Sequence, residues 1–566
     1  MFENCDRRVL SEEYFDFILD YEIDENTIPA NSGVCYTEIS PIFKALYVPV
    51  MLVPSKVLDV YGYKIFVRLF GLLDMSSLEA SNITRLHYNP NLNVTGQGVL
   101  IGIIDTGIDY THNAFRYADG TTRIVSIWDQ TIQEGQPPTD LVFGTEYSRD
   151  QINTALKSGN PSEIVPSKDD VGHGTFLAGI AAGNEDSYNS FSGVATDSEL
   201  VIVKLKQTKQ NLRELYRVPK DAICFQENDI MLGIKYLLSV AQNLGRPLSI
   251  CIGLGTSQGG HDGRGALGLY LSIINNMEGI AVSVAAGNEG NTRRHYEGFL
   301  ITGVDKETVE LNVGPKEPGF GMEIWSDIPS TFSIELYSPT GEYVPIITPR
   351  LGERRTVRFF FNSTTIEIYF QLLGSRSGSQ LVILFFDHPG AGIWRMVINK
   401  ISRNIDLRYH IWLPMRNFLN EKTYFINSSP FTTLTSPADS NALIVATAYN
   451  SLNDSIAPEA SRGYTRYGEI VPHFAAPGVG LIGPGQANSY SVRSGTSIAA
   501  AHTAGVAAML LEWGIIKGHL RSMNGIDIKN MLLIGADRDI GGPYPNREWG
   551  YGLLDVYGAF ERLSGQ

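Results

Sequence analysis

Cysteine is scarce in this chain, with four residues among 566. They stand at positions 5, 35, 224 and 251, without close pairs and without the spacing of a zinc site. So few cysteines exclude a small fold framed by disulfides. We expect reduced thiols, with Cys251 serving as a small core residue inside the apolar run 248–252.

Basic residues and long apolar runs are also in short supply. Lys and Arg number 45 against 60 Asp and Glu, a net charge of −15. Nucleic-acid binding relies on clustered cations, so we expect no nucleic-acid partner, and the acidic excess fits solubility. No stretch reaches the roughly 20 uninterrupted apolar residues of a membrane span. The nearest is 498–511, which His502 and Thr503 interrupt, and we expect a buried core helix there.

The first residues, 1–8, lack the apolar segment of a secretory signal. We therefore expect no signal peptide and synthesis in the cytoplasm. Neither a metal nor a cofactor is indicated, because no oxygen-rich loop of the calcium-binding kind stands out. The pairs Asp169-Asp170 and Glu185-Asp186 are interpreted as solvated turns.

Against this background three short motifs stand out, each at the end or the start of an apolar run. Asp105 precedes Thr-Gly, His173 precedes Gly-Thr, and Ser497 follows Gly-Thr. A serine hydroxyl is a poor nucleophile unless an imidazole takes its proton and a carboxylate orients that imidazole. Asp, His, Ser is one of the chain orders in which this set occurs. The sequence therefore predicts a catalytic triad of these three residues.

Each motif alone also has a plain structural interpretation as a turn, a packed histidine or a loop. A fourth element makes chance a poor explanation. Asn288 ends the apolar run 280–284 in Ala-Ala-Gly-Asn, where its amide would donate to the oxyanion of a tetrahedral intermediate. Asp109 and Asp170 are rival carboxylates, but Asp105 is preferred because it directly ends its strand.

The residues around these motifs resemble the subtilisin-like serine proteases. Segments 99–109, 172–179 and 494–502 resemble the family's Asp, His and Ser segments, although Ala501 stands where the family usually has proline. The resemblance covers 76–291 and 433–566. It implies a serine endopeptidase that acts through an acyl-enzyme and needs no cofactor.

The resemblance also indicates substrate-binding residues. Gly253, Leu254 and Gly255 resemble the backbone segment that lines the S1 pocket and binds the substrate main chain, a strand-end turn being the alternative. Lys204 and Lys206 are either an opposite wall of the cleft or solvated side chains. We interpret His473 and His502 as structural.

Apolar strands alternate with helices through the protease-like part. Strands are expected at 99–104, 199–206, 248–253 and 280–285, and helices at 173–182, 229–243 and 264–276. This alternation predicts an α/β fold, a parallel sheet with helices on both faces. Sites in such sheets lie at the carboxyl ends of strands, which is where Asp105 and Asn288 stand.

Residues 1–75 precede this part and predict a small α+β domain. A helix is expected from Ser11 through Leu19, then strands at 45–50 and 64–69 with a helix near 54–58 between them. The unit resembles the family's prodomain, which implies self-cleavage between Phe70 and Ser77 and a prodomain that occupies the active site and can remain bound. An ordinary accessory domain is the alternative.

Residues 292–432 interrupt the protease-like part and alternate with period two at 331–337, 365–370 and 407–413. They predict an inserted jelly roll or β-sandwich. The whole arrangement resembles the Csp germination proteases of spore-forming clostridia, which activate the precursor of a spore-cortex lytic enzyme. That resemblance implies a protein substrate and a spore-associated location. A catalytically silent scaffold in germination signalling and a general intracellular or released protease remain alternatives.

Overall fold

A large sheet forms the centre of the computed structural model, which describes residues 5, 8–20, 32–54, 62–73, 94–350, 354–371, 378–402, 404–540 and 542–564. Within these residues its strand order is β25-β24-β12-β10-β5-β8-β6-β7, with β26 also paired to β24. The central pairs are parallel, as expected, while β7 and β25 run antiparallel at the two ends. The strands are β5 (Leu100–Asp105), β6 (Ile124–Asp129), β7 (Thr145–Ser148), β8 (Glu199–Lys204), β10 (Leu248–Ile252), β12 (Ile280–Ala285), β24 (Ile444–Asn450), β25 (Ser455–Ile456) and β26 (Phe474–Pro477).

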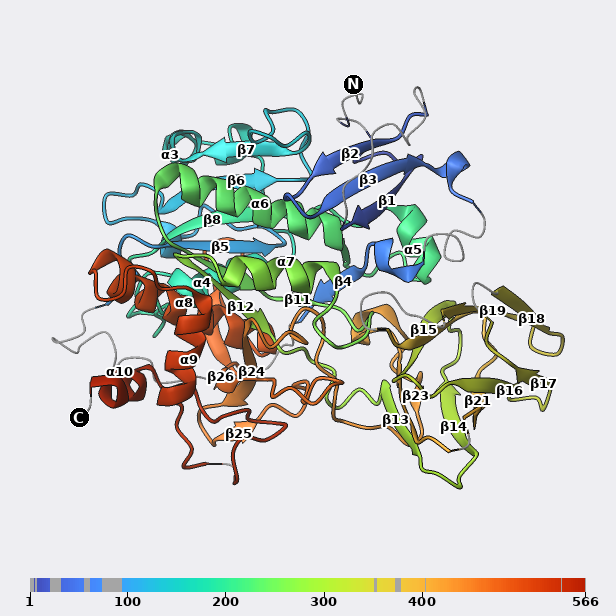
Figure 1. The fold of residues 1–566 in the computed structure, drawn as a ribbon. Helices are drawn as coiled ribbons and strands as arrows, with labels where there is room; N and C mark the ends of the chain where they lie inside the picture. Colours follow the sequence, from blue (N-terminus) through green and yellow to red (C-terminus); the bar gives the residue numbers. More distant parts are fainter. Residues whose placement is uncertain are drawn as a thin grey trace.

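Helices cover both faces of this sheet. Leu237 of α6 packs closely against Gly102 of β5, since a Cβ on this glycine would lie 2.5 Å from the leucine Cδ1. Ser249 of β10 points to the opposite face and donates to the Ala504 carbonyl of α8 at 2.7 Å. Figure 1 shows α6 and α7 in front of the sheet. The helices are α3 (Arg149–Lys157), α4 (His173–Ala182), α5 (Gln210–Tyr216), α6 (Glu227–Leu244), α7 (Ala266–Asn275), α8 (Thr496–Leu511), α9 (Gly525–Gly535) and α10 (Val556–Ser564).

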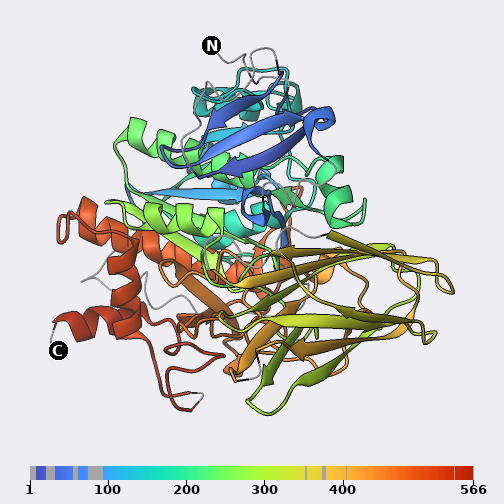
Figure 2. The same ribbon diagram turned by 45° about the vertical axis from the view of Figure 1, so that its right-hand side comes forward.

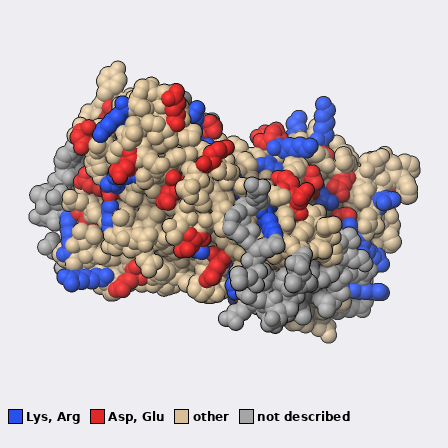
Figure 3. Space-filling view, turned by 90° about the horizontal axis from the view of Figure 1, so that it is seen from above, with Lys and Arg blue, Asp and Glu red and all other residues tan. Residues whose placement is uncertain are grey.

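The segment Thr496–Ile516, which contains α8, is long and apolar enough by composition to cross a membrane, and it is the single such helix in the part of the chain that the structure describes. Yet 89% of its apolar window is buried inside the protein. The expected core helix at 498–511 is therefore confirmed. On the face of the molecule seen in Figure 3, acidic and basic side chains are interspersed.

The N-terminal part forms a three-stranded antiparallel sheet, in the order β1-β3-β2, that lies beside α6 (Figure 1). The helix expected from Ser11 to Leu19 is wrong, because β1 (Tyr14–Leu19) is a strand. Its aromatic side chains favour a strand, and burial on both faces removes the alternation that marks one. The other strands are β2 (Cys35–Glu38) and β3 (Lys44–Pro49). Most of the helix expected near 54–58 lies outside the described residues.

The expected strand at 64–69 is also displaced. A short 3-10 turn, η3 (Tyr63–Ile65), precedes β4 (Leu69–Leu72), and β4 leaves the N-terminal sheet. It pairs instead with β9 (Phe225–Gln226) and β11 (Leu254–Gly255) of the body. The segment expected to end the N-terminal sheet thus pairs with strands from the part of the chain that carries the central sheet.

A disulfide joins Cys5 and Cys35, so the expectation of four reduced thiols is wrong for these two. The bond ties the start of the chain to β2, across 30 residues of sequence. Cys224 and Cys251 are free thiols, as expected, and both are buried, which confirms the expected core position of Cys251. Two cysteines so far apart carry no pairing signal in the sequence, because the fold alone brings them together.

The insertion consists of two antiparallel sheets with a hydrophobic core of their own. Figure 2 shows the two layers side by side, set apart from the central sheet. The expected all-β insertion is therefore present. One sheet contains β13 (His295–Leu300), β15 (Gly319–Ser326), β18 (Arg354–Phe359), β19 (Thr364–Gln371), β20 (Gln380–Asp387) and β22 (Leu407–Trp412); the other contains β14 (Lys306–Val313), β16 (Phe332–Tyr337), β17 (Tyr343–Ile347), β21 (Gly392–Lys400) and β23 (Tyr424–Phe425).

Candidate active site

The three predicted triad residues lie within hydrogen-bonding distance of one another. His173 opens α4, and its Nδ1 lies 2.7 Å from Oδ1 of Asp105 at the end of β5. Its Nε2 lies 3.2 Å from the Oγ of Ser497 in the first turn of α8. All three side chains are at most 1% exposed. A carboxylate, an imidazole and a hydroxyl in this row can transfer a proton from the hydroxyl to the imidazole.

Asp169 joins the elements that carry Asp105 and His173. Its Oδ1 accepts hydrogen bonds from the Thr106 hydroxyl and the Gly172 amide, both at 2.7 Å. Its Oδ2 accepts from the amide and the hydroxyl of Thr175 at 2.8 and 2.7 Å. Asp169 is 4% exposed, so its interpretation as a solvated turn residue is wrong. An acidic residue shortly before a helix is a helix-start signal, and that signal could have identified it.

Asn288 lies just beyond β12 with its amide held in one orientation. Its Oδ1 accepts hydrogen bonds from the amide and the hydroxyl of Thr496, at 3.2 and 3.0 Å. Its Nδ2 is buried and has no hydrogen-bond partner among the described residues. The amide therefore keeps its donor end available beside Ser497, as an oxyanion donor requires.

The chain's own strand β4 ends beside these residues. β4 lies between β11 and β9, with Leu72 opposite Leu254 and Gly71 opposite Gly255. This places the predicted substrate-binding segment beside an extended peptide. At the end of β4, the carbonyl oxygen of Leu73 accepts a 2.8 Å hydrogen bond from the Ser497 Oγ and lies 3.5 Å from the Ser497 amide nitrogen. No motif in the sequence had indicated Leu73.

Gly253 completes the contact between this segment and the triad. A Cβ on Gly253 would lie 2.5 Å from Leu177 Cδ1, 3.1 Å from Ser497 Cβ and 3.3 Å from His173 Cε1. The glycine thus permits a close approach that any larger residue would obstruct. Gly255 in turn lies against Leu73, whose Cδ1 would be 2.9 Å from a Cβ there.

The rival and secondary residues lie outside the triad. Asp109 accepts from the Ala487 amide at 2.9 Å, and the largely exposed Asp170 lies 3.7 Å from Lys204. Lys206 is 7% exposed and pairs at 2.6 Å with Asp229, whose pKa burial raises to about 6, so its interpretation as a solvated side chain is wrong. Among the described residues, no group of three or more His, Cys, Asp or Glu side chains has the arrangement of a metal site.

The two other histidines singled out in the sequence are packed inside the body. Burial lowers the pKa of His502 to about 4. His473 accepts from the Val445 amide at 3.1 Å and bonds Asn441 at 2.9 Å, and burial holds its pKa well below the usual range. Both side chains are buried and away from the triad contacts, in agreement with the expected structural role.

Comparisons with known proteins agree with this geometry. The model of the subtilase family, peptidase S8, matches residues 96–310 and 420–552. The solved structure of the Clostridium perfringens CspB protease matches 85% of this chain and 97% of its own, with 32% identity and a TM-score of 0.75.

Two curated proteases match more distantly. The C5a peptidase of Streptococcus pyogenes is 20% identical over 520 residues, and the subtilisin-like protease SBT2.2 of Arabidopsis thaliana is 29% identical over 126 residues. The chain spans 40% and 15% of their respective lengths. These two relatives therefore support the family, while their own substrates do not transfer.

Proposed function

We propose, from the premise that this chain belongs to the subtilase family of proteases, that it is a serine endopeptidase with Asp105, His173 and Ser497 as its triad. The observation that carries the proposal is the position of His173, within reach of both the carboxylate and the hydroxyl. The Ser497 Oγ attacks the scissile carbonyl carbon as His173 takes its proton. Asp105 holds the imidazole in the required tautomer and stabilises its charged form.

The next steps use the donors around Ser497. Asn288 Nδ2 and the Ser497 amide bind the oxyanion of the tetrahedral intermediate. His173 then donates its proton to the leaving amine, which departs and leaves an acyl-enzyme. Water, activated by the same imidazole, releases the acyl group and restores the free serine.

The first substrate in this proposal is the chain itself, cut after Leu73. The Leu73 carbonyl oxygen lies at the Ser497 hydroxyl and amide, and β4 reaches it as an extended strand between two body strands. This bond falls inside the interval from Phe70 to Ser77 indicated by the sequence. Residues 1–73 then act as a prodomain that stays in the cleft after cleavage.

The physiological substrate in this proposal is a protein precursor, activated by limited proteolysis during spore germination. The similarity to CspB over nearly that whole chain supports this role and a spore-associated location. The inserted domain, which we propose to be a jelly roll, braces the protease body. The compact triad favours a protease over a silent scaffold.

A pair of variants tests the chemistry. Wild-type chain is expected to split into two fragments, with mass spectrometry showing one that ends at Leu73. Ser497→Ala is expected to stay whole and to resist labelling by a fluorophosphonate. The exposed Ser187→Ala is the matched control and should split like wild type. A Ser497→Ala chain that still splits after Leu73 would exclude Ser497 as the nucleophile.

A further inference from the structure

The inserted domain contacts the strand β4 through the segment between β22 and β23. This segment passes Met415 and the 3-10 turn η6 (Arg416–Phe418) on its way from one sheet of the insertion to the other. There the Asn417 side-chain amide donates to the Leu72 carbonyl at 3.4 Å. A segment outside the protease body thus contacts the strand that occupies the cleft.

This segment leaves no space for a side chain at Gly71, the third residue before the bond that follows Leu73. A Cβ on Gly71 would lie 2.9 Å from Met415 Sδ, 3.1 Å from Met415 Cε and 3.3 Å from Phe418 Cζ. Gly71 is absent from the glycines with positive φ, so its backbone suits any L-residue. The neighbouring side chains, and not the backbone conformation, therefore disfavour a residue larger than glycine at this position.

The contacting side chains are held in place. Met415 is 2% and Phe418 is 4% exposed, and the Phe418 amide donates to the Met415 carbonyl at 2.9 Å. The Arg416 amide donates at 3.0 Å to Oε1 of Glu289, the residue that follows Asn288. Glu289 itself is 5% exposed. The segment is thus anchored one residue from the oxyanion donor.

We propose that Met415 and Phe418 form a specificity-determining wall that restricts the third residue before the scissile bond to glycine. The inference rests on the proposed endopeptidase function and assigns its substrate class: protein segments that enter the cleft as a strand, with glycine at this position. The insertion then selects substrates in addition to bracing the body. A larger residue at this position overpacks a buried contact, which is destabilising.

The full chain tests this wall, because β4 is its own substrate. The rate of splitting after Leu73 is followed by gel during pulse-labelled cell-free synthesis. Gly71→Ala is expected to split about tenfold more slowly or worse, since one methyl group must displace Met415. Met415→Val keeps an apolar residue but removes both contacting atoms, and the double variant Gly71→Ala/Met415→Val is expected to recover most of the wild-type rate.

Two further variants make the result specific. Met51 is 90% exposed, so Met51→Val should not rescue Gly71→Ala. Phe418→Leu removes the Cζ contact and should give a partial rescue. Wild-type splitting with an equally fast Gly71→Ala would overturn the wall alone, as would a slow Gly71→Ala that neither Met415→Val nor Phe418→Leu accelerates. A wild-type chain that never splits would instead refute the proposed self-cleavage.

Discussion

At the scale of single residues, hydrogen bonds from Thr496 fix the orientation of the buried Asn288 side-chain amide. The amide and the hydroxyl of Thr496 both donate to the side-chain carbonyl oxygen of Asn288, and the Asn288 amide nitrogen has no hydrogen-bond partner among the described residues. A buried donor without a partner costs about 1–3 kcal/mol. In the proposed mechanism the oxyanion at Ser497 supplies the missing acceptor, so this interaction strengthens as the tetrahedral intermediate forms.

Asn288→Ala is therefore expected to slow self-cleavage about 100- to 1000-fold while leaving the fold intact, because one oxyanion donor is lost. Splitting after Leu73 is measured during cell-free synthesis, with a thermal melt to compare stability. The exposed Asn276→Ala is the matched control and should split at the wild-type rate. Equal rates for Asn288→Ala and wild type would remove Asn288 from the mechanism.

The residues of the site differ in how far the sequence could predict them. Asp105, His173, Ser497 and Asn288 each belong to a short local motif whose residue types the chemistry requires, and the structure brings all four together. Asp169 was missed because its partners come from two separate segments. Its position before α4 is a local helix-start signal, but no local pattern reveals its distant partner Thr106.

At the scale of elements, Gly253 and the short strand β11 that follows it lie between β4 and the triad. Gly253 allows Leu177, His173 and Ser497 to approach the cleft backbone. The backbone there accepts an L-residue, since Gly253 is not among the positive-φ glycines. Any Cβ at this position must therefore push the triad side chains rather than strain the strand.

Gly253→Ala is expected to reduce the rate of self-cleavage about tenfold, because contacts of 3.1 and 3.3 Å displace Ser497 and His173 slightly, and a full displacement of about 1 Å at the reacting groups costs about 100-fold. Gly159→Ala is the matched control, because a Cβ there meets no atom within 4 Å. Both rates are read from the same splitting assay. A Gly253→Ala chain that matches Gly159→Ala would show that the triad tolerates this contact.

Elements of the body were easier to predict than those of the N-terminal part. The strands β5, β8, β10 and β12 begin and end within two residues of the expected bounds, because apolar runs buried on both faces are unambiguous when helices separate them. The strand β1, by contrast, was expected to be a helix. Its apolar residues matched a helical period, and only the pairing with β3 explains its extended form.

At the scale of the whole molecule, three parts of the chain meet around buried polar groups that no local pattern could reveal. Glu323 of the insertion accepts hydrogen bonds from the Tyr63 hydroxyl of the N-terminal part and from the Gly259 amide of the body at 3.0 Å. Burial raises the pKa of Tyr63 well above its usual range, so the phenol remains a donor. The insertion thus braces the two other parts at once.

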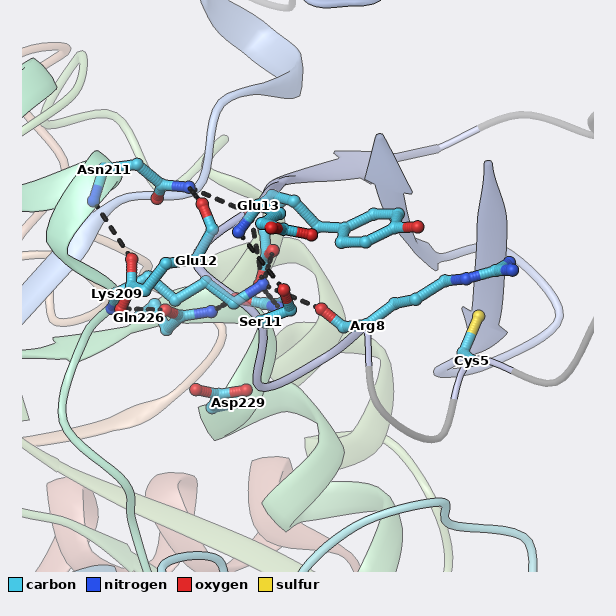
Figure 4. A network of polar contacts seen from close by, with 12 residues as sticks. Cys5, Arg8, Ser11, Glu12, Glu13, Lys209, Asn211, Gln226 and Asp229 are labelled. Atoms are coloured by element: carbon cyan, nitrogen blue, oxygen red, sulfur yellow. Dashed lines mark hydrogen bonds and ion pairs between the residues drawn. The ribbon is translucent and has the colours of Figure 1, made fainter. Parts of the chain in front are cut away.

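A second polar network holds the N-terminal part on the body. Asp16 is fully buried; its Oδ1 pairs with Lys209, and its Oδ2 accepts from Gln226 and Asn228 at 2.7 and 3.1 Å. Burial lowers the pKa of Lys209, and the Asp16 charge opposes that shift. Figure 4 shows Lys209, Gln226 and Asn211 of the body close to Glu12, with Arg8 and Cys5 farther to the right. Because this network does not involve the bond after Leu73, the proposed cleavage leaves it intact.

Asp16→Ala is accordingly expected to release the cleaved prodomain. Loss of one partner leaves Lys209 buried without its counter-charge, which costs about 3–5 kcal/mol, or about 10²- to 4 × 10³-fold in the dissociation constant. After splitting, size-exclusion chromatography at decreasing protein concentration measures whether residues 1–73 co-elute with the remainder.

The exposed Glu13→Ala is the matched control and should co-elute like wild type. The double variant Asp16→Ala/Lys209→Met should retain the prodomain better than Asp16→Ala, since it buries no unpaired charge. If Asp16→Ala co-elutes with the remainder of the chain as tightly as Glu13→Ala does at every concentration, the ion pair is not what retains the prodomain.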